Sequence, residues 1–150
     1  MRKTLIKLIS SIFYLGYLPL RGTLASILAI VIYLVFKDLT YLYLLIVIIS
    51  ILLGFLVSGE AEIIYKEKDS KKIVIDDLCG MLFSLILFPK KPYQIIGVFL
   101  VFRILDFLKP YPADKVEEIP GKGVMLDDFI AALYTNLIYL LFLLLKNYFQ

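Results

Sequence analysis

Carboxylates within apolar runs are the residues of this chain best placed to do chemistry. Five aspartates lie inside or at the edges of such runs: Asp76, Asp77, Asp106, Asp127 and Asp128. A carboxylate at the centre of a membrane helix costs about 2.5–3.5 kcal/mol, so five facing lipid would cost roughly ten kcal/mol or more. We therefore expect these side chains to face one another, a cation or water, and to form a functional site.

The composition indicates an integral membrane protein. The 150 residues are 61% hydrophobic with a mean hydropathy of +0.91, whereas soluble domains are nearer 45–50% apolar. The length suits one domain over residues 1–150, and the net charge of +3 is too small to indicate a nucleic-acid partner. The chain has no histidine, which excludes a Ser-His-Asp triad, a histidine base and a histidine zinc site. Carboxylate oxygens instead suit Mg²⁺ or Mn²⁺.

The hydropathy pattern predicts an all-α membrane bundle of about six helices, some of them short or only partly spanning. Crossing the hydrocarbon core takes about 20 residues, and only the third and the last apolar segments are comfortably long enough. No strand-like alternation appears. The apolar segments are 5–20, 24–36, 40–57, 73–88, 93–108 and 124–145.

Following the chain across the membrane places every unusual polar group at one face. If loop 58–72 lies on one side, the pair at 76–77 starts the segment that leaves that side. Asp106 then ends the segment that returns, and the pair at 127–128 starts the last segment. The stretch 21–23 begins an earlier segment at the same face. Lys and Arg are in excess on this side, which favours a cytoplasmic orientation.

The adjacent pair Asp76–Asp77 is predicted to lie in the first turn of a helix. Adjacent residues lie about 100° apart around a helix, so the two carboxylates can share one ion or serve two. Gly80, one turn further on, is expected to leave room beside Asp76. The alternative is that the pair caps the helix and complements its macrodipole, although capping needs only one acid.

Arg103, Asp106 and Lys109 are spaced three residues apart at the predicted end of a helix. This spacing puts Arg103 and Asp106 on one face. A phosphate clamp would use the forked guanidinium of Arg103 and the point charge of Lys109, with Asp106 orienting them or binding metal. The alternative is a helix-terminal ion pair followed by a proline stop signal.

Two further stretches precede predicted helices. Lys122 lies in a glycine-containing loop that leads into the second aspartate pair, and such loops offer N–H groups to an anion. Ala131 and Ala132, one turn beyond that pair, allow neighbouring helices to approach closely. Arg21 and Thr23 could contact a headgroup phosphate, although Thr23 could equally be a helix N-cap.

Together these motifs resemble the phosphatidylglycerophosphatase A family, which are small, bacterial, Mg²⁺-dependent lipid phosphatases of the inner membrane. The resemblance runs from about Gly16 to Asn136. Its most specific part is FRILDFLKPYP, followed by the aspartate pair of GKGVMLDD; IVIDDLCGM and the stretch Gly22–Ser26 also match. The chain departs from the family where Arg21 replaces a common proline and Asp77 a usual glutamate. Ala25 and Lys122 also replace the family's glycine and small residue.

The resemblance implies removal of the terminal phosphate of phosphatidylglycerophosphate, giving phosphatidylglycerol and inorganic phosphate at the cytoplasmic face of the bacterial inner membrane. Mg²⁺ would be held by the two aspartate pairs (Asp76, Asp77, Asp127 and Asp128), and Arg103 and Lys109 would help to neutralise the phosphate. The attacking group is either a water, activated by metal or by one of Asp76, Asp77 and Asp106, or a carboxylate that forms an aspartyl-phosphate. Soluble relatives of the family are described as six-helix bundles with one helix surrounded by the others.

Two alternatives remain from other classes. The acids of a small cation transporter or channel would bind ions in transit, but a pathway needs polar groups through the full membrane thickness rather than at one face. Phosphatidyl transfer also uses paired aspartates, but its spaced Asp-Gly-Ala-Arg-type signature is absent from this sequence.

Overall fold

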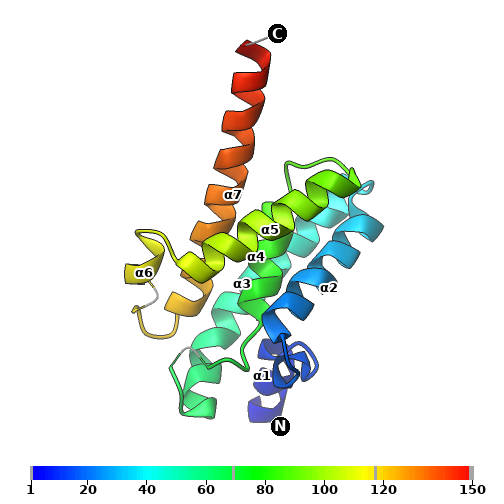
Figure 1. Ribbon diagram of the computed structural model, residues 1–150. Coiled ribbons are helices and arrows are strands. Elements are labelled where there is room, and N and C mark those ends of the chain that lie inside the picture. Colours follow the sequence, from blue (N-terminus) through cyan, green and yellow to red (C-terminus); the bar gives the residue numbers. More distant parts are fainter. Residues whose placement is uncertain (1, 69, 117, 149–150) are drawn as a thin grey trace.

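The computed structural model describes residues 2–68, 70–116 and 118–148, and within them every regular element is helical. Figure 1 shows the helices gathered into a bundle, from which the C-terminal half of the last helix projects. The elements are α1 (Arg2–Ser10), the 3₁₀ helix η1 (Leu15–Tyr17), α2 (Arg21–Phe36), α3 (Thr40–Tyr65), α4 (Ile75–Ser84), α5 (Pro92–Leu108), α6 (Ala113–Val116) and α7 (Gly123–Tyr148).

The apolar segment 5–20 does not form one continuous helix, contrary to the sequence prediction. Helix α1 ends at Ser10, and the next residues include three with left-handed backbone, at positions 12–14. The Ser11 hydroxyl donates to the Lys7 carbonyl at 2.6 Å and accepts the Tyr14 N–H at 3.1 Å. A serine that bonds nearby backbone groups in this way competes with helix continuation. The break lets the Ser10 carbonyl accept the Val74 N–H at 3.0 Å, which ties α1 to the residues that precede α4.

Helices α3 and α7 are the two described helices long and apolar enough to cross a membrane, as the sequence predicted. Only 28% of the most apolar stretch of each is buried in the protein, whereas the core helix of a soluble protein would be mostly buried. Large apolar side chains such as Leu52, Leu56, Leu141 and Phe142 are more than half exposed. Exposed apolar surface on this scale indicates a lipid or protein contact.

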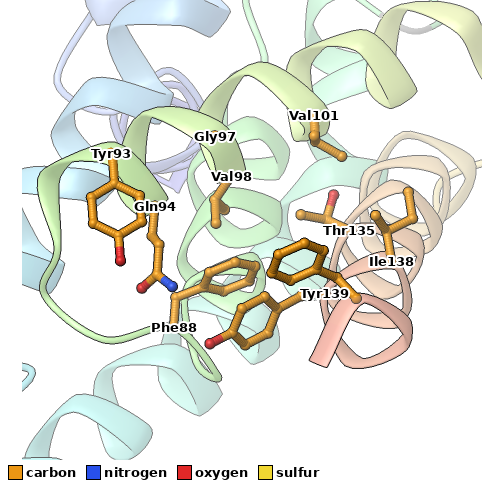
Figure 2. Close-up of a pocket in the computed structure, with 10 residues that line it drawn as sticks. Phe88, Tyr93, Gln94, Gly97, Val98, Val101, Thr135, Ile138 and Tyr139 are labelled. Carbon is orange, nitrogen blue, oxygen red and sulfur yellow. The ribbon is translucent and has the colours of Figure 1, made fainter. Parts of the chain in front are cut away.

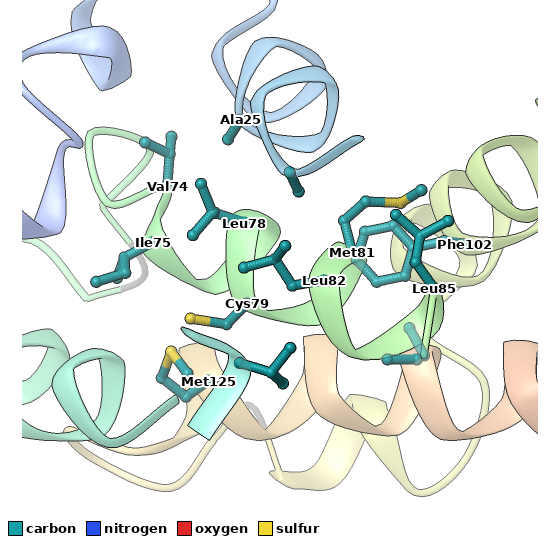
Figure 3. Packing of buried hydrophobic residues seen from close by; sticks show 14 of the residues in the cluster. Ala25, Val74, Ile75, Leu78, Cys79, Met81, Leu82, Leu85, Phe102 and Met125 are labelled. Carbon is teal, nitrogen blue, oxygen red and sulfur yellow. The ribbon is translucent and has the colours of Figure 1, made fainter. Parts of the chain in front are cut away.

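Helix α4 is the centre of the bundle and the main reason that the site has a fixed shape. Its ten residues rise only about 15 Å, half the thickness of a membrane core, and most of them are buried. Figure 3 shows its side chains packing between α2, represented by Ala25, and the helices that carry Phe102 and Met125. One helix is therefore surrounded by the others, as the family resemblance implied.

The carbonyl end of α4 is satisfied by side chains from its neighbours. The Tyr43 hydroxyl donates to the Leu82 carbonyl at 2.6 Å, and Asn136 donates to the Phe83 carbonyl at 3.2 Å. Helix ends otherwise leave four carbonyls without partners, and burial makes that costly. These bonds fix the short helix along its axis, and so fix the depth of the aspartates in its first turn.

Gly80 does not leave open space beside Asp76, contrary to the sequence expectation. A Cβ atom on Gly80 would lie 2.8 Å from the Phe102 ring and 3.2 Å from the Asp128 carbonyl oxygen. The glycine therefore allows α5 and α7 to close onto α4. Ala131 and Ala132 are fully buried on α7, which agrees with the predicted close approach of helices at that point.

Candidate functional site

A polar pocket of about 220 Å³ collects the charged residues of four helices at one end of the bundle. All five aspartates found by sequence line it, although they come from three helices. So do four cations, of which Lys71 was not anticipated. Its charged residues are Arg21, Lys71, Asp76, Asp77, Arg103, Asp106, Lys109, Asp127 and Asp128. The five aspartates therefore meet in one pocket, and their location at one membrane face stays a prediction.

The local structure places the acids close to where the sequence predicted. Asp76 and Asp77 are in the first turn of α4, whose N-cap is Val74 with no side-chain capping bond. Asp106 is in the last turn of α5. The prediction that Asp127 and Asp128 lie in a first turn is wrong, because α7 already begins at Gly123 and puts them one turn further in.

Three carboxylates form the closest group. Asp76, Asp77 and Asp128 each offer an oxygen, and these atoms all lie within 4.8 Å of one another. Oxygen ligands of Mg²⁺ lie 2.0–2.1 Å from the ion, so opposite ligands are about 4.2 Å apart. The three oxygens are therefore close to the spacing at which one divalent cation can bridge them after small side-chain shifts.

Two atoms of this group are buried without a partner in the part of the chain that the structure describes. They are Asp76 Oδ1 and Asp128 Oδ2, on side chains that are themselves buried. A buried carboxylate oxygen without a partner is strongly unfavourable. A bound cation would remove this penalty, so the donor set fits a divalent metal ion.

The carboxylates of this group are crowded as well as buried. Asp76 and Asp128 are both buried, and one oxygen of each lies within 4.8 Å of the others and of Asp77. Repulsion between the carboxylates and loss of water therefore both disfavour full ionisation unless a cation is present.

Arg103 joins two helices rather than only ending one. Its Nη1 lies 2.9 Å from Asp106 Oδ2 on the same helix, as the spacing predicted. The same nitrogen also donates to Asp77 Oδ1 on α4. All three side chains are partly buried. The sequence did not indicate the Arg103–Asp77 bond, because its partners are 26 residues apart and meet only through the packing of α5 on α4.

Lys109 and Asp127 form a further ion pair of the pocket. Lys109 Nζ lies 2.7 Å from Asp127 Oδ2, and Asp127 Oδ1 accepts the Asp128 N–H at 2.9 Å. Asp127, predicted as a metal ligand, thus has both oxygens engaged by the protein, and the close group of three carboxylates does not include it. Lys109, predicted to contact phosphate, lies in the same pocket.

The stretch around Gly22 lies against the carboxylate of Asp77, one of the group of three aspartates. The reading of Thr23 as N-cap is wrong, because α2 begins at Arg21 and its N-cap is Leu20. A Cβ on Gly22 would lie 2.6–2.9 Å from the Asp77 carboxylate, so only glycine permits this approach. Thr23 does not line the polar pocket; it lines an adjoining depression that shares Arg21, Gly22 and Arg103 with that pocket.

Lys122 does not line the pocket. It is exposed on the turn before α7, where Gly121 N–H donates to Glu62 Oε2 at 2.9 Å. At least one amide of the predicted anion-binding loop is therefore used within the protein. Sequence reasoning missed Ser70 and Lys71, which line the pocket just before α4. The only signal for them was the pair of lysines at positions 71 and 72, directly before the apolar run.

Within the part of the chain that the structure describes, the charged groups do not continue as a pathway through the bundle. Beyond the aspartates, α4 and its C-cap carry Met81, Leu82 and Leu85, all fully buried. The buried hydroxyls of Ser58, Ser84 and Thr135 bond carbonyls of their own helices. This disfavours the transporter alternative. The charged residues instead form a pocket of acidic and basic side chains at one end of the bundle.

Comparisons with known proteins agree with the motifs. The chain matches the family described as Phosphatidylglycerophosphatase A over residues 8–143. It is 32% identical to the Escherichia coli phosphatidylglycerophosphatase A over 114 residues, which is 73% of this chain and 66% of that protein. Identity to the Haemophilus influenzae phosphatidylglycerophosphatase A is 36% over 75 residues, 47% of this chain and 45% of that protein.

A third relative carries a different substrate in its name. The chain is 31% identical over 118 residues to a Bacteroides thetaiotaomicron protein provisionally named a phosphatidylinositol-3-phosphatase, covering 75% of this chain and 74% of that protein. No solved structure gives a significant match.

Proposed function

Because this chain belongs to the phosphatidylglycerophosphatase A family of lipid phosphatases, we propose that it hydrolyses the terminal phosphate monoester of phosphatidylglycerophosphate. The products are phosphatidylglycerol and inorganic phosphate, as a step in phospholipid biosynthesis. The observation that supports this best is the group of Asp76, Asp77 and Asp128 beside the paired cations Arg103 and Lys109. Its chemistry suits a phosphate monoester and a divalent cation.

Charge counting favours a metal in this site. Among the described residues, five carboxylates and four cations line the pocket, a formal charge of −1, so a phosphate dianion would meet repulsion. We propose that Asp76, Asp77 and Asp128 hold Mg²⁺. When bound, Mg²⁺ supplies positive charge for the phosphoryl oxygens and lowers the pKa of a coordinated water.

The cations of the chain would bind and orient the phosphate. Arg103 uses Nη1 for Asp77 and Asp106, which holds the planar guanidinium in place and leaves its other N–H groups to donate to phosphate oxygens. Lys109 adds a point charge from the rim. Arg21, with Thr23 in the adjoining depression, lies where a headgroup can extend from the pocket.

We propose that water is the nucleophile and that one of the five aspartates of the pocket accepts its proton. Asp77 and Asp106 are the most accessible of these aspartates, with side chains 15% and 17% exposed. The other route is attack by an aspartate on phosphorus, with the phosphate held covalently before water releases it. Acid quenching of a single turnover separates the two, because phosphate that stays on the protein identifies a carboxylate nucleophile.

Substrate identity is tested by phosphate release from two lipids in the same detergent. We expect the purified protein to hydrolyse phosphatidylglycerophosphate at a higher kcat/KM than phosphatidylinositol 3-phosphate, the substrate suggested by the name of the Bacteroides relative. A preference for the inositol lipid would replace the proposed substrate while keeping the site. No release from either lipid with Mg²⁺ present would reject the proposal.

Gly22→Ala tests the approach of α2 to the acid group. The added methyl group would displace the Asp77 carboxylate, and a misplaced group in a catalytic constellation can cost tenfold or more in rate. We expect activity to fall about tenfold or more while the protein still folds, because only a side-chain end has to move. Val35→Ala, at the exposed other end of α2, should leave the rate unchanged. Equal activity of the two variants would contradict the contact.

We also propose that the chain is a multi-pass protein of the bacterial cytoplasmic membrane with the pocket toward the cytoplasm. Cysteines introduced at Lys68 and Lys115 should then react with a membrane-impermeant maleimide from the cytoplasmic side, and one at Lys90 from the opposite side. The native Cys79 is buried and should stay unlabelled. Labelling of Lys68→Cys and Lys115→Cys from opposite sides would contradict this topology.

A further inference from the structure

A second cavity, of about 320 Å³, lies between α5 and α7 and shares no lining residue with the acid pocket. Figure 2 shows Gly97 and Val98 on one side of it and Thr135, Ile138 and Tyr139 on the other. We call it the α5–α7 groove.

The chemistry of the α5–α7 groove suits an apolar ligand. Among the described residues, no Asp, Glu, Lys or Arg lines it. The hydroxyl of Thr135 donates to the Ala131 carbonyl of its own helix at 2.9 Å. At the end farther from the acid pocket, the rings of Phe88 and Tyr139 stack with centroids 3.9 Å apart. The other polar side chains of its lining are Gln94, on the first turn of α5, and the phenols Tyr93 and Tyr139.

The groove runs along two of the four helices that carry the acid pocket. On α5, Val101 and Gly97 precede Asp106 by five and nine residues, which is about 7 and 13 Å along the axis. On α7, Thr135 follows Asp128 by seven residues, about 10 Å. One leaflet of a bilayer has acyl chains about 15 Å deep, half of the hydrocarbon core. Measured along each helix, the groove residues Val101, Gly97 and Thr135 thus lie within the depth of one leaflet from the acid pocket.

Gly97 is the residue that opens the groove. A Cβ added there would meet no atom within 4 Å in the described chain. Glycine inside a helix is destabilising relative to alanine, and Gly97 lies in the interior of α5 with no close internal packing to require it. The space in front of it is therefore space for something other than the chain itself.

We propose that the α5–α7 groove binds one acyl chain of the lipid whose phosphate occupies the acid pocket, so that these two helices select acyl-chain length. The identity of that lipid rests on the proposed function. The acyl chain of the lipid would enter the groove near Val101 and end near Gly97, before the polar side chain of Gln94.

The first test compares Gly97→Phe with Ile96→Phe, its exposed neighbour on the same helix. Substrates are dihexanoyl and dipalmitoyl phosphatidylglycerophosphate in the same detergent. Gly97→Phe should lower kcat/KM for the palmitoyl lipid about tenfold, because blocking the chain misplaces the headgroup. It should leave turnover of the hexanoyl lipid, whose chains are too short to reach position 97, unchanged, and Ile96→Phe should affect neither. Equal losses on both lipids, or no loss on the palmitoyl lipid, would overturn the proposal.

The second test does not depend on catalysis. Phosphatidylglycerol with a diazirine near the end of its palmitoyl chain should label groove residues such as Val98 and Ile138 in the wild type, and this labelling should be lost in Gly97→Phe. Labelling without phosphatase activity would reject the proposed function and keep the groove. Labelling spread evenly over α2 and α3 would overturn the groove proposal, as would rapid disulfide formation between two copies of Gly97→Cys, because a second copy would then fill the groove.

Discussion

Asp128→Asn and Asp76→Asn are each expected to lower the rate of phosphate release at least about a hundredfold, because a metal ligand or base is lost. Both residues carry a buried oxygen without a partner in the described chain, so an uncharged side chain of the same shape should still fold. In EDTA, the variants should melt at the temperature of the wild type or above it, since an unpaired buried charge has been removed.

Metal binding supplies the second readout for these variants. Mg²⁺ should raise the melting temperature of the wild type, because a ligand that binds only the folded state stabilises it, and it should have little effect on either variant. Asp38→Asn is the matched control, since Asp38 is exposed at the other end of the bundle and pairs with Lys90. Near-normal activity of Asp76→Asn or Asp128→Asn would remove that residue from the site.

The second large effect is expected at Arg103. Lysine keeps the charge but loses the fork that contacts Asp77, Asp106 and, as proposed, phosphate. Arg103→Lys should therefore cost around one to three kcal/mol of transition-state stabilisation, the worth of a charge-assisted hydrogen bond. That corresponds to roughly a fivefold to 160-fold loss of kcat/KM. Asp106→Asn should be harmful as well, because it orients Arg103 or binds metal.

A double mutant separates this role from a purely structural one. If Arg103 and Asp106 only close the end of α5, Arg103→Leu with Asp106→Leu should retain much of the activity that either single change destroys. If Arg103 contacts the phosphate, the double mutant should be at least as inactive as Arg103→Leu. Both singles and the double are measured at saturating Mg²⁺, and recovery in the double would reject the phosphate-binding role.

The parts of this structure that depend on local chemistry could be predicted from sequence. The Arg103–Asp106 pair follows from helical spacing, and α3 and α7 follow from the length of their apolar runs. The gathering of the acids at one end follows from the alternation of apolar segments and hydrophilic loops. Each of these inferences needs only a helix and its direction.

The parts of the structure that depend on packing between helices could not be predicted from sequence. The contacts of Asp77 with Arg103 and Gly22 join α4 to α5 and α2, and no periodicity codes for them. The break after α1 depends not only on local bonds of Ser11 but also on the bond from the Val74 N–H to the Ser10 carbonyl, which joins α1 to the residues before α4. The separation of Asp127, paired with Lys109, from the group of three carboxylates depends on how α7 turns against α4 and α5.

The most direct test of the account is phosphate release from phosphatidylglycerophosphate by the purified wild-type protein, first in EDTA and then after addition of excess Mg²⁺. We expect no turnover in EDTA, full turnover after Mg²⁺ is restored, and no restoration in Asp128→Asn. Turnover by the wild type that is equal in EDTA and in Mg²⁺ would contradict the proposal that Asp76, Asp77 and Asp128 form a metal-dependent phosphatase site.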